Sequence, residues 1–420
     1  MAAERPLAAY IAVTAAYWAF MLTDGALRML VLLHFHTLGF SPIQLAYLFL
    51  FYEFMGMVTN LSAGWIAARF GLTSTLYAGL GIQVVALLAL TQLDPTWSVA
   101  ASVTFVMAVQ GASGVAKDLS KMSAKSAVKI LAPDEGGVLF RWVALLTGSK
   151  NAVKGLGFLL GAVLLGVFGF NASLWVMAAI LVVILAAVAL FMPSGLPRGR
   201  KGAKFSEVFS KDRNVNRLSA ARVFLFGARD VWFVVGIPVF FYSVLSDGSV
   251  EGNRAAFFMI GTFMALWIIG YGAVQAAAPT LLGGAARPVS EIGRAASPWA
   301  FAVAAIPAVL AAVAHLAPQA AWLPGVVAAG LLAFGVVFAL NSALHSYLIL
   351  AFTRDDRVTM DVGFYYMSNA AGRLLGTLLS GVSYQVGGLP LCLATAALMA
   401  VVSAFAARGL GQEARGLAEG

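Results

Sequence analysis

The chain has 420 residues, of which 61% are hydrophobic and 11% are charged, and its formal net charge at pH 7 is +9. Apolar stretches follow one another almost from end to end, which excludes a soluble globular protein and leaves little chain for a soluble domain. A basic chain can also bind nucleic acid. Here the uneven distribution of Lys and Arg among the loops explains the surplus, so nucleic acid is not an expected partner.

Twelve stretches have the length of a membrane-spanning helix, which needs about 20 mainly apolar residues. Lipid offers the backbone no hydrogen-bond partners, so these stretches should be helices and the lipid bilayer is the expected surrounding. The predicted fold class is an all-α membrane protein with twelve transmembrane helices. In chain order the predicted spans are 8–36, 43–69, 73–92, 97–127, 138–168, 171–193, 216–245, 255–281, 298–316, 320–352, 358–386 and 388–408.

A basic linker divides the spans into six and six. Ser194–Arg217 contains seven Lys or Arg residues and two acidic ones. Because positive loops stay in the cytoplasm, the even-numbered connections and both termini should be cytoplasmic. The predicted organisation is a six-helix bundle over 1–193, a cytoplasmic linker over 194–217 and a second six-helix bundle over 218–420.

The two halves repeat each other faintly at their charged positions. Asp24–Arg28 in the first span corresponds to Gly227–Asp230 in the seventh, and Asn151–Lys154 in the fifth corresponds to Asn369–Arg373 in the eleventh. Repeated halves with a binding site at their interface are typical of secondary transporters.

Charged residues inside the spans are the candidates for function, because one charge at the centre of a membrane helix costs roughly 2.5–3.5 kcal/mol. Residues four apart share a helix face, which groups Asp24 with Arg28, and Lys150 with Lys154. Lys117 begins a row of lysines along the fourth span. The candidate substrate-binding residues are Arg28, Lys117, Lys150, Asn151, Lys154, Arg229, Tyr365, Asn369 and Arg373.

Internal ion pairing is the structural alternative to a binding site. Seven cations at depth outnumber five acids, so a positive surplus remains even if every acid is paired. Asp118 and Asp230 adjoin cations in sequence, so we expect the neighbouring side chains to point in different directions. Arg and Lys together suit a phosphate-like oxyanion. Asp24, Glu53 and Asp230 are the candidates for proton coupling.

Other classes of function lack their signatures. The sequence has no Walker loop, metal-ligand cluster or nucleophile elbow, so we expect no enzyme, no catalytic residue, no cofactor and no metal. The single cysteine, Cys392, cannot form an intrachain disulfide and should be a small packing residue.

A short motif follows the second span. Gly64–Gly71 reads GWIAARFG and resembles the loop signature of the major facilitator superfamily at Gly64, Arg69 and Gly71. Ala68 stands where that signature usually has an acidic residue. With the division into six and six spans, the chain resembles this superfamily.

Longer segments resemble one family within it. The segments around Tyr17–Arg28, Phe51–Phe54, Ala116–Lys125, Trp142–Gly155 and Arg222–Phe233 resemble the organoarsenical efflux permeases, the ArsJ family, of bacterial arsenic-resistance operons. The resemblance implies a bacterial inner-membrane exporter of 1-arseno-3-phosphoglycerate that confers arsenate resistance. It also implies a functional partner, a glyceraldehyde-3-phosphate dehydrogenase, which makes this compound from arsenate.

Two other interpretations stay open from the sequence. A related antiporter that exchanges another organophosphate for inorganic phosphate would have a similar cationic cavity. A sensor or scaffold that kept the transporter fold without transport is a different class. A dehydrogenase gene and an arsenic-responsive repressor gene beside this one would favour arsenical export.

Overall fold

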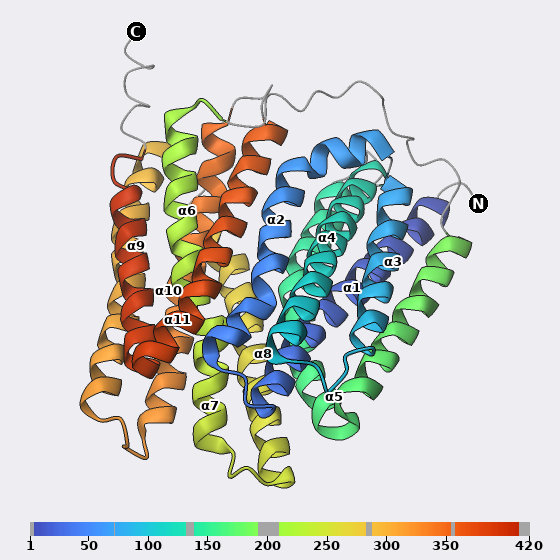
Figure 1. The fold of residues 1–420 in the computed structure, drawn as a ribbon. Helices are drawn as coiled ribbons and strands as arrows, with labels where there is room; N and C mark the ends of the chain where they lie inside the picture. Colours follow the sequence, from blue (N-terminus) through green and yellow to red (C-terminus); the bar gives the residue numbers. More distant parts are fainter. Residues whose placement is uncertain are drawn as a thin grey trace.

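The protein is described as a computed structural model covering residues 4–70, 72–131, 138–191, 210–282, 288–353 and 358–410. All elements in these ranges are helical (Figure 1). They are α1 Glu4–Thr37, α2 Pro42–Phe70, α3 Leu72–Leu90, α4 Val99–Leu131, α5 Val138–Phe191, α6 Arg213–Val231, the π-helix η1 Trp232–Gly236, α7 Ile237–Leu245, α8 Val250–Leu281, α9 Val289–Leu316, α10 Leu323–Phe352 and α11 Val358–Ala406.

The described ranges contain ten helical stretches that are long and apolar enough to cross a membrane. Two of them, α5 and α11, are broken by glycines. Gly169 has φ 75° and Gly388 has φ 60°, a left-handed conformation that glycine adopts without a steric penalty. Each break falls where the sequence predicts a boundary between two spans. Divided at these glycines, the helical stretches overlap the predicted ranges, although α9 begins at Val289 and not at 298.

Several helix ends follow local sequence signals. Asp212 precedes α6 and its carboxylate accepts a hydrogen bond from the Val215 amide at 2.9 Å. Ser249 precedes α8 and accepts from the Gly252 amide at 2.9 Å. Both are capping arrangements that satisfy an amide left free by the first helical turn. Most of the predicted linker lies outside the described residues, as does Gly71, and the domain boundaries therefore stay predictions.

In accordance with the predicted division, we call α1–α5 the N-terminal bundle and α6–α11 the C-terminal bundle; α2 packs on α11 and α5 packs on α8 between them. In each bundle, glycines let a corresponding pair of helices, α1 with α5 and α6 with α11, pack closely. A Cβ at Gly25 of α1 would lie 2.8 Å from the Lys154 carbonyl oxygen of α5, and a Cβ at Gly376 of α11 would lie 2.7 Å from the Gly227 carbonyl oxygen of α6. The two halves therefore repeat the same close helix packing, which only small residues allow.

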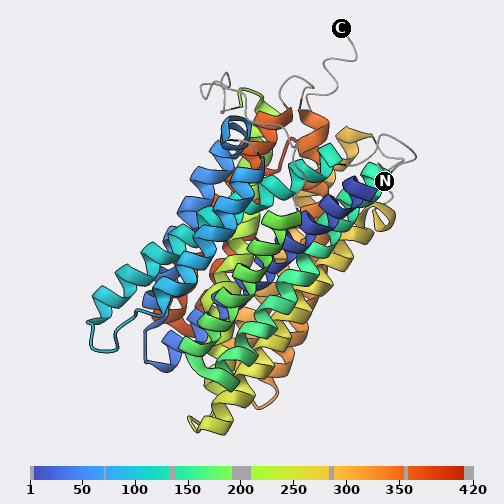
Figure 2. The ribbon, with the colours of Figure 1, turned by 90° about the vertical axis from the view of Figure 1, so that its right-hand side faces the viewer.

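The two ends of the molecule carry different parts of the chain. The start of α1 and the end of α11 lie at the same end, at the top of Figure 1, and Figure 2 shows them there again from the side. The connections from α1 to α2 and from α7 to α8 lie at the opposite end. We call these the terminal end and the far end.

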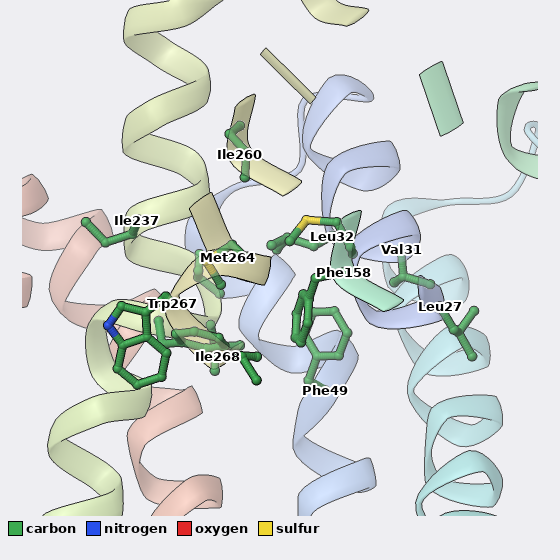
Figure 3. Packing of buried hydrophobic residues seen from close by; sticks show 14 of the residues in the cluster. Leu27, Val31, Leu32, Phe49, Phe158, Ile237, Ile260, Met264, Trp267 and Ile268 are labelled. Atoms are coloured by element: carbon green, nitrogen blue, oxygen red, sulfur yellow. The ribbon is translucent and has the colours of Figure 1, made fainter. Parts of the chain in front are cut away.

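Apolar side chains fill the space between the bundles below the middle of the helices. Figure 3 shows Leu27 and Phe158 from the first bundle in the same layer as Ile237, Met264 and Trp267 from the second. The rings of Phe158 and Phe233 meet edge to face with centroids 5.8 Å apart. This apolar layer joins the two bundles on the side of the helices that leads to the far end.

Candidate functional site

A cavity of about 520 Å³ lies between the two bundles. Its deepest lining residues, such as Phe158 and Phe233, belong to the apolar layer. Others, such as Lys121 of α4 and Gln275 of α8, lie farther along their helices toward the terminal end. The cavity therefore runs from mid-membrane toward the terminal end, and its volume suits a small molecule, for which sites of about 300–1,000 Å³ are usual.

The cavity wall is strongly positive. Its only acidic members in the described ranges are Asp118 and Asp230, so basic side chains outnumber acidic ones by eight to two. The basic side chains on the wall are Arg28, Lys117, Lys121, Lys150, Lys154, Arg222, Arg229 and Arg373.

A buried acid beneath the wall connects the two bundles. Glu53 of α2 is fully buried, and its Oε1 accepts hydrogen bonds from Arg28 Nη2 at 2.5 Å and from Arg373 Nη2 at 2.6 Å. Arg28 belongs to the same bundle and Arg373 to the other, so one carboxylate holds two guanidinium groups across the interface. Charge-assisted hydrogen bonds of this kind are the strong ones in proteins.

The chain of charges continues into the second bundle. Arg373 Nε donates to Asp230 Oδ2 at 3.4 Å, and Arg229 Nη2 lies 2.5 Å from Asp230 Oδ1. The expectation that Arg229 and Asp230 point apart because they are neighbours in sequence is wrong. The long arginine side chain reaches sideways to the adjacent carboxylate, directly before the backbone changes to the π-helix η1.

Asp118, in contrast, forms its ion pair with a lysine one turn away and not with its sequence neighbour Lys117. Its Oδ1 pairs with Lys121 Nζ at 3.3 Å, one helical turn away, while Oδ2 accepts from Thr59 at 2.8 Å and from Asn60 at 3.1 Å. Lys117 instead lies over the Tyr52 ring, 4.3 Å from its centroid. The row of lysines along α4 is therefore divided between an ion pair and an aromatic contact.

Asp24 does not pair with Arg28, although the two share a helix face. The Tyr52 hydroxyl donates to Asp24 Oδ1 at 2.6 Å, and Asp24 Oδ2 has no hydrogen-bond partner among the described residues. Asp24 is buried, with 3% of its surface exposed. Of the three candidates for proton coupling, it is the one without an arginine hydrogen-bonded to it, whereas Glu53 and Asp230 each hold two.

Lys154 has no acidic partner within salt-bridge distance in the described part of the chain. Its ammonium lies 6.0 Å from the Phe158 ring centroid, and its electrostatic neighbours are the carboxylate of Asp24 and the cations of Arg373, Arg28 and Lys117. Three of these four neighbours are cations, and like charges repel one another. Lys154 is half-buried on the cavity wall and adds positive charge there that no acid within salt-bridge distance offsets in the described part of the chain.

The predicted site residues are mostly brought together. Eight of the nine line the cavity, and the ninth, Tyr365, lies behind the wall with 1% of its surface exposed, while Tyr366 lines the cavity in its place. The sequence prediction omitted Arg222, which lines the same cavity and is 4% exposed. Its signal was present, since it lies seven residues before Arg229 and thus on nearly the same face of α6.

The far end is closed by direct contacts between the bundles. The rings of His36 and Tyr242 lie edge to face, 4.7 Å apart, and the Ile43 amide donates to Gln385 Oε1 at 3.1 Å. These two contacts join the bundles at the end of the molecule opposite to the one toward which the cavity runs. Most of the Gly64–Gly71 motif lies outside the residues whose side chains are described.

Comparison with known proteins agrees with this fold. No protein-family model and no curated protein matches the chain. It is similar to a POT family transporter in complex with 5-aminolevulinic acid and to one in complex with a thioalcohol-conjugated peptide. For each of these the TM-score is 0.69, the identity 12%, and 94% of either chain is covered.

A third structure, from work on substrate recognition in proton-dependent oligopeptide transporters, has a TM-score of 0.70 at 14% identity and covers 98% of this chain and 100% of the other. The chain has the major facilitator superfamily fold. At these identities the similarity concerns the fold alone. The three similar structures are all described as transporters.

Proposed function

We propose that this protein is a secondary transporter that exports a small organic polyanion. The observation that carries the proposal is the cavity wall, where eight basic side chains face two acidic ones between the halves of a transporter fold. A net positive cavity in the membrane is costly when empty. A ligand that carries several negative charges removes this cost, and a neutral or cationic ligand does not.

The proposed substrate is 1-arseno-3-phosphoglycerate, in accordance with the resemblance to the organoarsenical efflux permeases. This compound carries an arsenate group and a phosphate group, and both are oxyanions that guanidinium and ammonium groups bind well. In this proposal the protein lies in the bacterial inner membrane with both termini in the cytoplasm. The cavity then faces the cytoplasm, where the partner dehydrogenase would make the substrate.

Transport would follow from the repeated close packing within each bundle. Glycine contacts keep α1 on α5 and α6 on α11, so each bundle moves as a unit. A ligand bound between Lys154 and the Glu53–Arg373 pair would contact both bundles and supply the charge that brings the cytoplasmic sides together. The apolar layer and the His36–Tyr242 contact would then separate, and the ligand would leave at the far end.

The test is arsenate tolerance in an arsenate-sensitive bacterium that expresses this protein with and without the dehydrogenase. We expect tolerance only with both, and we expect Lys154→Gln to abolish it. Arg294→Gln is the matched control, because Arg294 is exposed on α9 outside the cavity wall. Tolerance without the dehydrogenase, or no tolerance with both proteins present in the membrane, contradicts the arsenical substrate.

Exchange of another organophosphate for inorganic phosphate is the alternative, and counterflow separates it from export. Vesicles loaded with inorganic phosphate should not accelerate uptake of labelled organophosphate if the proposed substrate is correct. Saturable phosphate-driven uptake would support the antiporter instead.

Proton coupling is a second part of the proposal, and Asp24 is its best candidate because no arginine donates a hydrogen bond to it. A polyanion also gains about 2.3 kcal/mol per charge per 100 mV when it leaves the cell, so export does not depend on protons for its direction. We expect Asp24→Asn to abolish the pH dependence of transport in inverted vesicles. If Asp24→Asn, Glu53→Gln and Asp230→Asn each leave that dependence unchanged, protons are not coupled through these residues.

A further inference from the structure

Arg222 of α6 lies in an environment unlike that of the other arginines on the cavity wall. Its Nε donates to Asn369 Oδ1 at 3.2 Å, and its Nη1 donates to the Ser342 hydroxyl at 3.1 Å and to the Ser342 carbonyl oxygen at 3.3 Å. The guanidinium carbon is 3.9 Å from the Phe226 ring centroid and 4.9 Å from that of Tyr365. Neutral groups thus hold the guanidinium in one fixed orientation.

No acid neutralises this arginine within the described ranges. Arg28, Arg229 and Arg373 all have carboxylate partners, whereas the hydrogen-bond acceptors of Arg222 are an amide, a hydroxyl and a carbonyl. Arg222 is buried yet lines the cavity, so its full positive charge acts on whatever occupies the cavity. A buried charge without a counter-ion is unfavourable, and the structure has kept it fixed by stacking and hydrogen bonds.

Further polar groups surround the same position. The Tyr271 hydroxyl lies 3.3 Å from the Ser342 hydroxyl, and Gln275 Nε2 donates to that hydroxyl at 3.4 Å. Gln275 and Asn369 also line the cavity. An oxyanion at Arg222 would therefore meet amide groups that can donate to its remaining oxygens. This is a built site and not an isolated charge.

The places of Arg222 and Asn369 along their helices indicate where the outer charge of a ligand would lie. The backbone rises about 10 Å between Arg222 and Arg229, although both guanidinium groups lie over the Phe226 ring, 3.9 and 4.9 Å from its centroid, and it rises about 6 Å between Asn369 and Arg373. Arg222 lies nearer the terminal end than Arg229, and Asn369 lies nearer it than Arg373. The cavity thus has two cationic regions, one around Lys154 at mid-membrane and one around Arg222 toward its opening.

We propose that Arg222, Asn369 and Gln275 form a second anion subsite that binds the outer charged group of a ligand whose other charged group binds at Lys154. The preferred ligand is then a short molecule with an oxyanion at each end, and Arg222 selects it over anions with one charged group. This inference rests on the proposed function, because it assigns a role within the same cavity.

The test compares two stable probes by isothermal titration with purified full-length protein in lipid nanodiscs. Propane-1,3-diol bisphosphate has two charged ends, and propyl phosphate has one. We expect Arg222→Gln to weaken bisphosphate binding by about ten- to a hundredfold, as for loss of one charge-assisted contact, and to leave propyl phosphate binding unchanged. Lys154→Gln should weaken binding of both probes, and Arg294→Gln of neither.

The outcomes separate this inference from the proposed function. If the wild-type protein binds neither phosphate, the anion-transport proposal itself fails. If the wild type binds both and Arg222→Gln weakens them equally, or changes neither, the second subsite is wrong while anion binding stands. Arg222→Lys guards against misfolding, because it keeps the charge and should retain part of the preference for the bisphosphate. If a folded Arg222→Lys protein loses the preference for the bisphosphate as completely as Arg222→Gln does, the charge of Arg222 does not provide that preference.

Discussion

Glu53 offers the sharpest test of how the charged network holds the two bundles together. Glu53→Gln keeps the shape of the side chain but removes the charge that lies between Arg28 and Arg373. Arg373 keeps Asp230 at 3.4 Å, whereas Arg28 has no second acid within salt-bridge distance in the described residues. Removing one partner of a buried ion pair costs about 3–5 kcal/mol, because the other charge stays buried. We therefore expect a clear loss of stability in the ligand-free protein.

The same variant should respond more strongly to ligand. With Glu53 neutral, the cavity region carries one more uncompensated positive charge, which a bound polyanion can neutralise. Scanning fluorimetry of purified protein, with and without propane-1,3-diol bisphosphate, measures both effects as the apparent melting temperature. We expect a lower value than wild type without the probe and a larger rise with it. Glu251→Gln is the matched control, because Glu251 is an exposed acid in the first turn of α8.

A double variant sharpens the experiment. Arg28→Gln combined with Glu53→Gln replaces the buried pair by two neutral amides, which is often nearly neutral for stability. The double variant should therefore be more stable than Glu53→Gln alone, a non-additivity that marks direct coupling. If Glu53→Gln melts like wild type without ligand and its ligand response is unchanged, this account of the network is refuted.

Three further outcomes are expected. Gly157→Ala should reduce the amount of folded protein in membranes, because the new Cβ would lie 2.5 Å from a backbone carbonyl oxygen of α1 and overpacking costs about 1–3 kcal/mol. Gly81→Ala is the control, because a Cβ at Gly81 meets open space. Equal yields of the two variants would contradict the close packing of α1 on α5. Cysteines at Ile43 and Gln385 in a cysteine-free protein should crosslink and block transport until reduced, whereas transport by the crosslinked protein would show that the far end does not open there. Cysteines in Ser194–Arg217 should resist impermeant labelling from outside intact cells, and efficient labelling would reverse the predicted orientation.

Much of the fold is predictable because its causes are local in the sequence. The thickness of the bilayer sets the length of each apolar stretch, and the lack of backbone partners in lipid makes each stretch helical. The breaks at Gly169 and Gly388 fall at predicted boundaries because glycine adopts left-handed backbone there without cost. The predicted helix ranges and the superfamily fold follow from these rules. The helix packing angles and the register of α2 against α11 do not.

The sequence predicts the positive charge of the candidate site but not which cations form ion pairs with which acids. A count of residues in the spans already indicated a cation surplus, since a charge in a membrane helix is too costly to be incidental. Helical spacing then placed most of the correct side chains on the cavity. Spacing says only which residues share a face of one helix. It therefore suggested Asp24 with Arg28, and Arg222 was left out of the candidate site although it lies on nearly the same face as Arg229.

The sequence alone thus determines that the membrane region holds more positive than negative charge, because no arrangement of the helices alters that sum. Only the tertiary structure decides which cations remain without an acid. Coulombic attraction depends on separation, and the separations are set by how helices far apart in sequence pack. Glu53 pairs with Arg28 and Arg373 because α2 lies between α1 and α11 at that depth. In the described ranges neither Lys154 nor Arg222 has an acid within salt-bridge distance, and the proposed ligand would offset their charge.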